Sequence, residues 1–376
     1  GDIDNVVLKA LAKDPSERYD SGLEFRAAVL KAAGLSDDLR RVTLSAPRGT
    51  DDAPSSGQWW DRFDDIDLIE IADGAKLYRG VDRNARAARA IKELSCPRAT
   101  GSAATPAVAR AEIARKRLFQ NEMHLLQSLT SNGASHPGIV KIYDVWPPRS
   151  GMEAAYSMEL LVRTLADRLA EGPLQEDEAV PIMKALCEAV GHLHSQGIVH
   201  RNITPKGVMF DNEGNVRLVG FDRACRMTDK EAVIAAESDI QAVANSPAEA
   251  MGDAAYMSPE QCRADDFDAR TDVYSLGCVF FHMLAGRPPF VGDDCLSLML
   301  KQLSETPPSV VSLGAKIQPS LENFLERALA KDPQDRFLDA NEAAESLERL
   351  GSGQPARSKG QAQPQPRTGV IRVAQR

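Results

Sequence analysis

The sequence has little cysteine and lacks any long apolar run. Its six cysteines are widely spaced and form no CxxC pair, which argues against a disulfide framework and a zinc motif. No stretch reaches the roughly 18–20 uncharged apolar residues that a membrane-spanning helix needs. The first residues also lack the charged-then-apolar profile of a signal peptide. We therefore expect a cytoplasmic protein, with a membrane tether only through sequence outside these residues, beyond residue 376.

Positive charge is also in short supply. Lys and Arg total 45 against 54 Asp and Glu, giving a net charge of −9, and this argues against a nucleic-acid-binding protein. Hydrophobic residues make up 43% and charged residues 26%, which is typical of a globular chain with room for a large core. Because the sequence begins with Gly1 rather than Met, we expect it to be a piece of a longer protein.

An internal repeat indicates how the chain is organised. The run Lys-Ala-Leu-Ala-Lys-Asp-Pro at 9–15 recurs as Arg-Ala-Leu-Ala-Lys-Asp-Pro at 327–333. Such a separation is far too long for a solenoid and fits one large domain plus a linker. We interpret residues 1–33 as the C-terminal end of a preceding domain similar to the one that ends near 350. Residues 34–62 contain a stretch rich in Ser, Asp, Pro and Gly and are predicted to be the linker.

The remaining sequence changes from strand-like to helical character. Short apolar runs bounded by turns predict strands from residue 63 onward, with one amphipathic helix at about 107–129. After Gly172 helical periodicity dominates, for example over 176–196. This order favours a two-lobed α+β fold. Its parts are an N-lobe at 63–158, a hinge at 159–162, a C-lobe at 163–350 and a basic, disordered tail at 351–376.

Several motifs, in order, resemble those of bacterial Ser/Thr protein kinases of the eukaryotic-like family. Any one of them would be weak evidence, but six or more in sequence are specific. They are Arg89-Ala90-Ile91-Lys92, Glu122 with His136-Pro137-Gly138-Ile139-Val140, Ile198-Val199-His200-Arg201, Met257-Ser258-Pro259-Glu260, Thr271-Asp272-Val273-Tyr274-Ser275-Leu276-Gly277, and Gly286-Arg287-Pro288-Pro289-Phe290. The resemblance implies a protein-kinase fold from about Phe63 to Leu350.

The same resemblance shows that four catalytic positions are replaced. Asn202 stands where the family has the catalytic aspartate, and a neutral amide cannot accept the proton of a substrate hydroxyl. Thr204 replaces the lysine that steadies the transferring phosphoryl group. Gly207 and Gly220 replace the two metal-binding residues and leave no oxygen ligand there. The resemblance therefore implies a pseudokinase, whose catalytic residues are degenerate.

The glycine-rich loop that covers the phosphates in this family is degraded as well. Counting back from Tyr78, the three expected glycines fall at Glu70, Ala72 and Ala75, while Gly74 is out of register. Backbone amides approach phosphates most closely at residues without a Cβ, and a glutamate would repel the phosphate charge. The loop is therefore predicted to bind phosphate poorly.

Other family positions are retained and outline a nucleotide pocket. Lys92 and Glu122 correspond to the ion pair that positions ATP, although such a pair can also be purely structural. The resemblance places the adenine-flanking residues at Leu77, Ala90 and Met209, and the gatekeeper at Met158, before the hinge residues Glu159 and Leu161. It also implies an internal framework of Leu126, His200, Phe221 and Asp272, and a buried Glu260–Arg336 ion pair.

Three functions fit this pattern of loss and retention. The first is a regulatory or scaffolding pseudokinase that binds protein partners, among them the preceding kinase-like domain. The second is a weakly active or unconventional ATP-dependent kinase that uses a displaced carboxylate such as Asp222 or Asp211. We expect the Asp222 side chain to point away from the site, which disfavours this alternative. The third is a metal-independent sensor that binds ATP without Mg²⁺. No metal ligand set is predicted.

Overall fold

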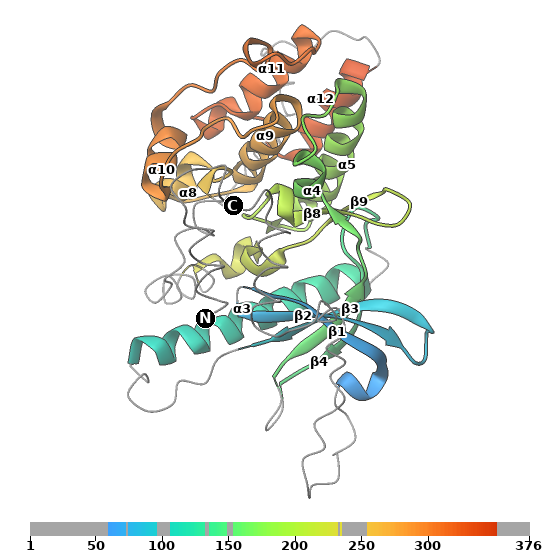
Figure 1. Ribbon diagram of the computed structural model, residues 1–376. Coiled ribbons are helices and arrows are strands. Elements are labelled where there is room, and N and C mark those ends of the chain that lie inside the picture. Colours follow the sequence, from blue (N-terminus) through green and yellow to red (C-terminus); the bar gives the residue numbers. More distant parts are fainter. Residues whose placement is uncertain are drawn as a thin grey trace, which may run out of the picture.

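The chain folds into two parts, one built around a sheet and one mainly helical (Figure 1). The computed structural model describes residues 59–72, 74–95, 106–131, 135–148, 153–231, 234 and 254–351. The predicted domain end at 1–33, the linker up to residue 58 and the tail after 351 lie outside the described residues. The two-lobed α+β fold predicted from the sequence is confirmed.

The N-lobe contains an antiparallel sheet in the order β1-β2-β3-β5-β4. Tyr78 of β2 and Ile91 of β3 lie opposite each other in the strand ladder and are buried together in the lobe's core. The strands are β1 Phe63–Ala72, β2 Ala75–Asp82, β3 Ala87–Leu94, β4 Ile142–Trp146 and β5 Ala155–Glu159.

One long helix, α3 (Pro106–Ser131), accompanies the sheet and carries Glu122. Its residues Leu125, Leu126 and Leu129 are nearly fully buried, and their spacing keeps them on one face of the helix. The helix predicted at about 107–129 is therefore confirmed with small extensions at both ends. Because α3 lies between the sheet and the C-lobe in Figure 1, it can connect the two parts.

The ordered N-lobe begins earlier than predicted. Trp59–Arg62 form a short 3-10 turn, η3, although the predicted linker extended to residue 62. Trp59 is 5% exposed, its ring lies 5.1 Å from that of Tyr78, and its Nε1 donates to Glu93 at 2.9 Å. Burial of a large aromatic ring outweighs the linker-like composition before it. Ordered structure therefore begins four residues before the predicted boundary at 63.

Asp82 ends β2 and is held by several donors. Its side chain is 2% exposed and accepts hydrogen bonds from Arg62 at 3.0 Å and from the backbone N–H of Ala85 at 3.1 Å. The hydrogen bond from Arg62 lowers the pKa of Asp82 to about 2, with burial opposing it. A lowered pKa means that this contribution to stability is present above pH 4 and is lost as pH falls from about 4 to 2.

We therefore expect Asp82→Asn to lower the free energy of unfolding at pH 7 by about 2 kcal/mol and to flatten its decline below pH 4. Chemical denaturation at several pH values measures both effects. Asp64→Asn is the matched control, because Asp64 pairs with Arg83 on the surface and should cost under about 1 kcal/mol. Equal losses for the two variants would contradict this assignment.

The C-lobe is built around helix α9 (Ala269–Ala285), which is buried along most of its length. Helices α5 (Glu176–Ser195), α11 (Pro319–Ala328) and α12 (Ala340–Gly351) pack against it and each other. The shorter helices are α4 Leu165–Leu169, α8 Pro259–Arg263 and α10 Cys295–Ser304, and the strands are β6 Arg163–Thr164, β7 Ile198–Val199, β8 Val208–Phe210, β9 Val216–Leu218 and β10 Cys225–Arg226. Short 3-10 turns are η5 Pro205–Gly207, η6 Phe221–Arg223, η7 Met227–Asp229, η8 Val311–Leu313 and η9 Pro333–Asp335. Within the described ranges, no helix is both long and apolar enough to cross a membrane.

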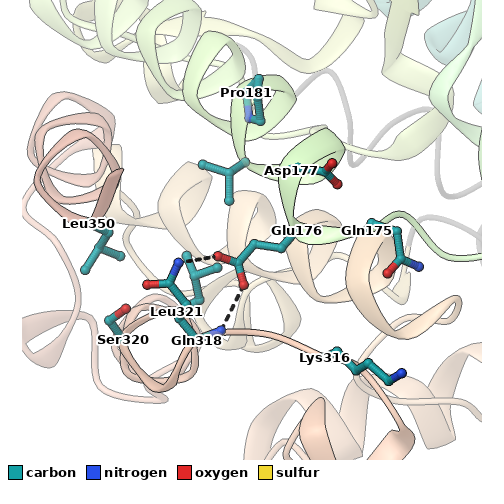
Figure 2. A pocket seen from close by; sticks show the side chains of 10 residues that line it. Gln175, Glu176, Asp177, Pro181, Lys316, Gln318, Ser320, Leu321 and Leu350 are labelled. Atoms are coloured by element: carbon teal, nitrogen blue, oxygen red, sulfur yellow. Dashed lines mark hydrogen bonds between the residues drawn. The ribbon is translucent and has the colours of Figure 1, made fainter. Parts of the chain in front are cut away.

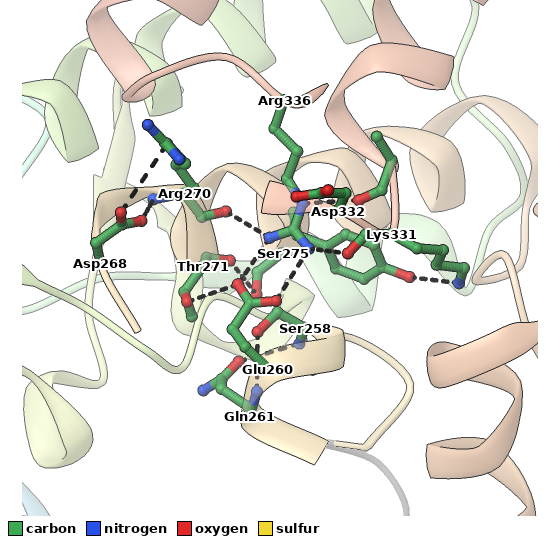
Figure 3. Close-up of polar contacts among 12 residues, drawn as sticks. Ser258, Glu260, Gln261, Asp268, Arg270, Thr271, Ser275, Lys331, Asp332 and Arg336 are labelled. Atoms are coloured by element: carbon green, nitrogen blue, oxygen red, sulfur yellow. Dashed lines mark hydrogen bonds and ion pairs between the residues drawn. The ribbon is translucent and has the colours of Figure 1, made fainter. Parts of the chain in front are cut away.

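A buried ion pair joins α8 to the segment after α11 (Figure 3). The Arg336 guanidinium donates to both carboxylate oxygens of Glu260, at 2.7 and 2.9 Å, and both side chains are almost completely buried. Thr271 at the start of α9 donates to the same carboxylate at 2.8 Å. Hydrogen bonds to the ionised carboxylate compensate for the loss of water around it. The ion pair expected from the resemblance is thus present.

Candidate functional site

Lys92 and Glu122 meet between the sheet and helix α3. The Lys92 Nζ donates to both carboxylate oxygens of Glu122, at 2.9 and 2.8 Å. The Glu122 side chain is 3% exposed, whereas that of Lys92 is 22% exposed and keeps some access to solvent. Burial lowers the pKa of Lys92, but the Glu122 carboxylate outweighs it and raises that pKa. The lysine therefore stays charged, and α3 is held against β3.

The strands beside this pair carry the apolar residues predicted to flank adenine. Leu77 lies opposite Lys92 in the β2–β3 ladder, and Ala90 lies opposite Met158 in the β3–β5 ladder. Met209 lies on β8 of the C-lobe, and it is partly buried like Leu77 and Met158. Leu77, Ala90 and Met158 therefore lie on three neighbouring strands, β2, β3 and β5, and the hinge follows β5.

The hinge that follows β5 is fixed by hydrogen bonds. The Glu159 carboxylate accepts from the backbone N–H of Lys141 at 2.8 Å and pairs with Arg217 of β9 at 3.3 Å. Leu161 is partly buried and packs against the main core. The contact between Glu159 and Arg217 was not predicted, because the sequence separation gives no signal for it. The carboxylate of Glu159 is thus engaged in holding the hinge to the C-lobe.

The loop between β1 and β2 is a tight hairpin. Ala72 pairs with Ala75 in the strand register, and Gly74 has a left-handed φ of +74°. The Gly74 carbonyl accepts from the N–H of Ser95 at 2.7 Å, and a Cβ at Gly74 would lie 3.1 Å from Arg115 of α3. The glycine that falls out of register for phosphate binding therefore has a structural use at the hairpin tip.

The catalytic-loop region after β7 is held by Asp272 at the start of α9. Asp272 is fully buried and accepts from the N–H groups of His200 and Arg201, both at 2.7 Å. It also contacts Nε2 of His194 at 2.9 Å. Burial raises the pKa of Asp272, but the hydrogen bond from His194 and its other partners lower it overall. The backbone before Asn202, the residue predicted to stand at the position of the base, is therefore anchored to α9.

His200, Phe221, Leu126 and Asp272 form the internal framework that we predicted. Each of the four is at most 1% exposed. The His200 and Phe221 rings pack edge to face with centroids 4.8 Å apart. Burial lowers the pKa of His200, which favours the neutral imidazole of a packed residue over a titrating catalyst. A further contact that the sequence did not reveal is a 2.9 Å hydrogen bond from Asn121 of α3 to the Ala224 carbonyl.

Three of the four replaced positions, Thr204, Gly207 and Gly220, shape the local backbone. Thr204 caps η5, where its Oγ1 accepts from the N–H of Gly207 at 3.3 Å. Gly220 has φ 80° and ψ 47°, a left-handed conformation in front of η6. A Cβ at Gly220 would lie 3.9 Å from the Cα of Gly207, so the two glycines lie close together. Neither glycine has a side-chain oxygen with which to bind a cation.

Asp222, the displaced carboxylate that we expected to point away from the site, is the middle residue of η6. Its Oδ1 lies 3.8 Å from the position that a Cβ of Gly220 would occupy. Its direction relative to the Lys92–Glu122 pair stays a prediction. The side chain is 39% exposed. The sequence offered one signal for this residue, an aspartate two positions after Gly220.

Asp211, the other displaced carboxylate considered, is engaged elsewhere. It accepts from Arg217 at 2.7 Å and from Asn215 at 2.9 Å in the turn between β8 and β9. Within the described ranges, no cluster of three or more His, Cys, Asp or Glu residues could hold a metal ion by itself. Asp211 is therefore a turn residue in this structure.

A pocket of about 480 Å³ lies away from this site, at the start of α5 (Figure 2). The Glu176 carboxylate in its wall accepts from the backbone N–H and the side-chain amide of Gln318, both at 2.8 Å. Its other lining residues include Val180, Leu321 and Leu350. These two hydrogen bonds join the start of α5 to the segment before α11.

Comparison with known proteins agrees with this architecture. A model of the protein kinase domain family matches residues 73–346. The chain is 33% identical over 252 residues to serine/threonine-protein kinase PknB of Mycobacterium leprae, which covers 66% of this chain and 39% of that protein. PknB of Mycolicibacterium smegmatis is 32% identical over 251 residues, with 66% and 38% covered, and PknB of Mycobacterium tuberculosis is 30% identical over 255 residues, with the same coverage. The chain thus spans about two fifths of the length of these relatives, and it belongs to the protein kinase domain family.

Proposed function

We propose that this domain is a pseudokinase, which transfers no phosphoryl group and acts as a regulatory or scaffolding domain in bacterial Ser/Thr kinase signalling. The proposal rests mainly on one observation: the ideal Cβ position of Gly220 lies 3.9 Å from the Cα of Gly207, so two residues without a side-chain oxygen lie close together at the positions that correspond to the family's metal-binding residues. Asn202 adds the loss of the proton acceptor. The framework residues and the Lys92–Glu122 pair are meanwhile in place.

Magnitudes support loss of activity over mere weakening. A general base contributes roughly 10²–10⁴-fold to a rate, and one charge-stabilising group roughly 10²–10³-fold. An ordinary kinase turns over about 1–100 times per second. Although such effects do not add simply, losing the base, the lysine and two metal ligands would lower the rate by at least about 10⁴-fold.

Protein kinases work with ATP and Mg²⁺, and the described residues fit the two unequally. Lys92 would face the phosphates, and the residues proposed to flank the adenine are Leu77, Ala90, Met158 and Met209. ATP would supply a polyanionic ligand whose binding can be sensed. Gly207 and Gly220 do not fit a metal-bound state, and Asp222 is the acidic side chain closest to their place.

The proposed partners are proteins, including the kinase-like domain suggested by residues 1–33. A buried framework that holds its shape suits binding that depends on shape. We propose a cytoplasmic location, with any membrane tether supplied by sequence outside this chain. An unconventional kinase that uses Asp211 is disfavoured, because that carboxylate already holds Arg217 and Asn215.

The proposal predicts no phosphate incorporation by the purified domain. Radiolabelled ATP with Mg²⁺ should label the wild-type chain and Lys92→Ala to the same background level. A bacterial kinase with an intact catalytic loop serves as the positive control for the assay. Metal-dependent labelling that Lys92→Ala abolishes would overturn the proposal, because it would require a working phosphoryl-transfer site.

A further inference from the structure

The pocket at the start of α5 leaves part of its apolar wall open to solvent (Figure 2). Its volume is about 480 Å³, and its lining residues come from α5, from the segment before α11, from the beginning of α11 and from the end of α12. Leu321 is buried, whereas Val180 and Leu350 are half-buried and Pro181 is exposed. A concave surface with open apolar side chains is a suitable place for a further segment of chain to bind.

The last described helix ends at this pocket. Helix α12 runs alongside α5 in the opposite direction: near its start, Asn341 donates to the Gly191 carbonyl at 3.1 Å, and near its end, Leu350 lines the pocket together with Val180. The helix ends at Gly351. Ten extended residues span up to about 33 Å, so the residues that directly follow α12 can reach across the pocket.

The rim of the pocket carries more acid than base. Glu176 and Asp177 line it from α5, and Lys316 lines it from the segment before α11, on a different side in Figure 2. The Glu176 carboxylate accepts two hydrogen bonds from Gln318. Asp177, in contrast, is exposed and forms no ion pair with any residue that the structure describes. A cationic side chain that entered the pocket would give this carboxylate a partner.

The sequence that follows α12 has the complementary charge. Residues 351–359 read Gly-Ser-Gly-Gln-Pro-Ala-Arg-Ser-Lys, with two cations and no acid. Pro355 and Ala356 are small apolar residues directly before Arg357. Because Arg357 comes seven residues after Leu350, the chain between them spans up to about 25 Å when extended. This segment therefore offers an apolar part for the open wall and a cation for Asp177.

We infer that residues 354–359 bind this pocket of their own chain, with Pro355 and Ala356 against the apolar wall and Arg357 paired with Asp177. A short tether gives the segment an effective concentration in the millimolar range, so a contact with a Kd of about 0.1 mM would be occupied most of the time. Docking would fix the direction in which the following sequence leaves the C-lobe. The inference goes beyond the proposed function and does not depend on whether the domain transfers phosphate.

Backbone ¹⁵N relaxation of the full chain tests this docking residue by residue. We expect order parameters above about 0.6 for residues 356–359 and below about 0.6 for residues 366–376. Asp177→Lys should lower the values of the docked residues to the level of the later tail. Glu178→Lys is the matched control: it makes the same charge change one residue further along α5, where the carboxylate pairs with Arg168 and does not line the pocket. It should leave the order parameters of the docked residues unchanged.

A charge swap separates this ion pair from a general attraction between a basic tail and an acidic protein. Arg357→Glu alone should release the segment, and because this residue follows the last described helix, the variant does not disturb the described fold. The double variant Asp177→Lys/Arg357→Glu leaves the net charge unchanged and should restore the order parameters, since opposite charges face each other again. Salt at 1 M shortens the screening length to about 3 Å and should weaken the docking of the wild-type chain.

Three results would overturn the inference. In the first, residues 356–359 of the wild-type chain have the same order parameters as the later tail. In the second, neither Asp177→Lys nor Arg357→Glu lowers them. In the third, the order is lost when the protein is diluted, which would assign the docked segment to a second copy of the chain.

Discussion

Arg336→Met is expected to lower the free energy of unfolding by about 3–5 kcal/mol, the largest loss of stability that we predict for a single substitution. The variant would leave the Glu260 carboxylate charged and buried without its partner. It would also remove the hydrogen bonds that Arg336 donates to the carbonyls of Ala330, at 2.7 Å, and Lys331, at 3.0 Å. Buried groups that lose their partners cost more than the net value of the bond itself.

Urea unfolding followed by circular dichroism at a helical wavelength measures this loss. The control is Arg349→Met, which removes an exposed ion pair with Glu345 one helical turn away and should cost under about 0.5 kcal/mol. The double variant Glu260→Leu/Arg336→Met should be more stable than Arg336→Met, because no buried charge remains. Equal midpoints for Arg336→Met and Arg349→Met would contradict the assigned role of the ion pair.

The buried ion pair matters because it belongs to the end of the activation segment. Its carboxylate lies on α8, directly after Ser258, which caps that helix, and Gln261 of the same helix donates to the Arg201 carbonyl at 2.8 Å. This segment is therefore tied both to the C-lobe core and to the catalytic loop. Both the Glu260–Arg336 ion pair and the hydrogen bond from Gln261 are present, as expected for a domain that is used for its shape.

The fold could be predicted because several motifs occur in the family's order along the chain and contain many buried residues. Lys92 and Glu122 are 30 residues apart, and the family resemblance suggested that they meet, as the structure shows them doing. The same holds for Glu260 and Arg336, which are 76 residues apart. The topology of the fold brings these residues together. A sequence that matches the motifs of the fold therefore also predicts these contacts.

Side-chain direction near a left-handed residue could not be predicted. The course of the chain after Gly220 depends on its φ and ψ, and glycine allows many values of both. The direction of the Asp222 carboxylate therefore stays a prediction. The linker-like composition ends before Trp59, and the burial of Trp59 shows that ordered structure starts there, four residues before the predicted boundary.

The second large effect concerns restoration of the chemistry. Asn202→Asp, Thr204→Lys, Gly207→Asn and Gly220→Asp together return the four residue types that the family uses. A Cβ at Gly207 would come no closer than 3.4 Å to its neighbours. Aspartate at residue 220 would have to adopt the left-handed φ of +80°, which it tolerates better than most residues. The loss of the Thr204 cap costs about 1 kcal/mol. We expect the combined variant to exceed the wild-type rate by at least about 100-fold, the lower bound for a recovered general base.

Single-turnover transfer of radiolabelled γ-phosphate to a generic protein substrate, measured for the wild-type chain and the combined variant side by side, tests the central claim most directly. We predict that the wild-type chain stays at the level of a buffer control and that the combined variant rises clearly above it. A wild-type rate well above that control, and unchanged by the four substitutions, would contradict the claim that these positions are where the chemistry was lost.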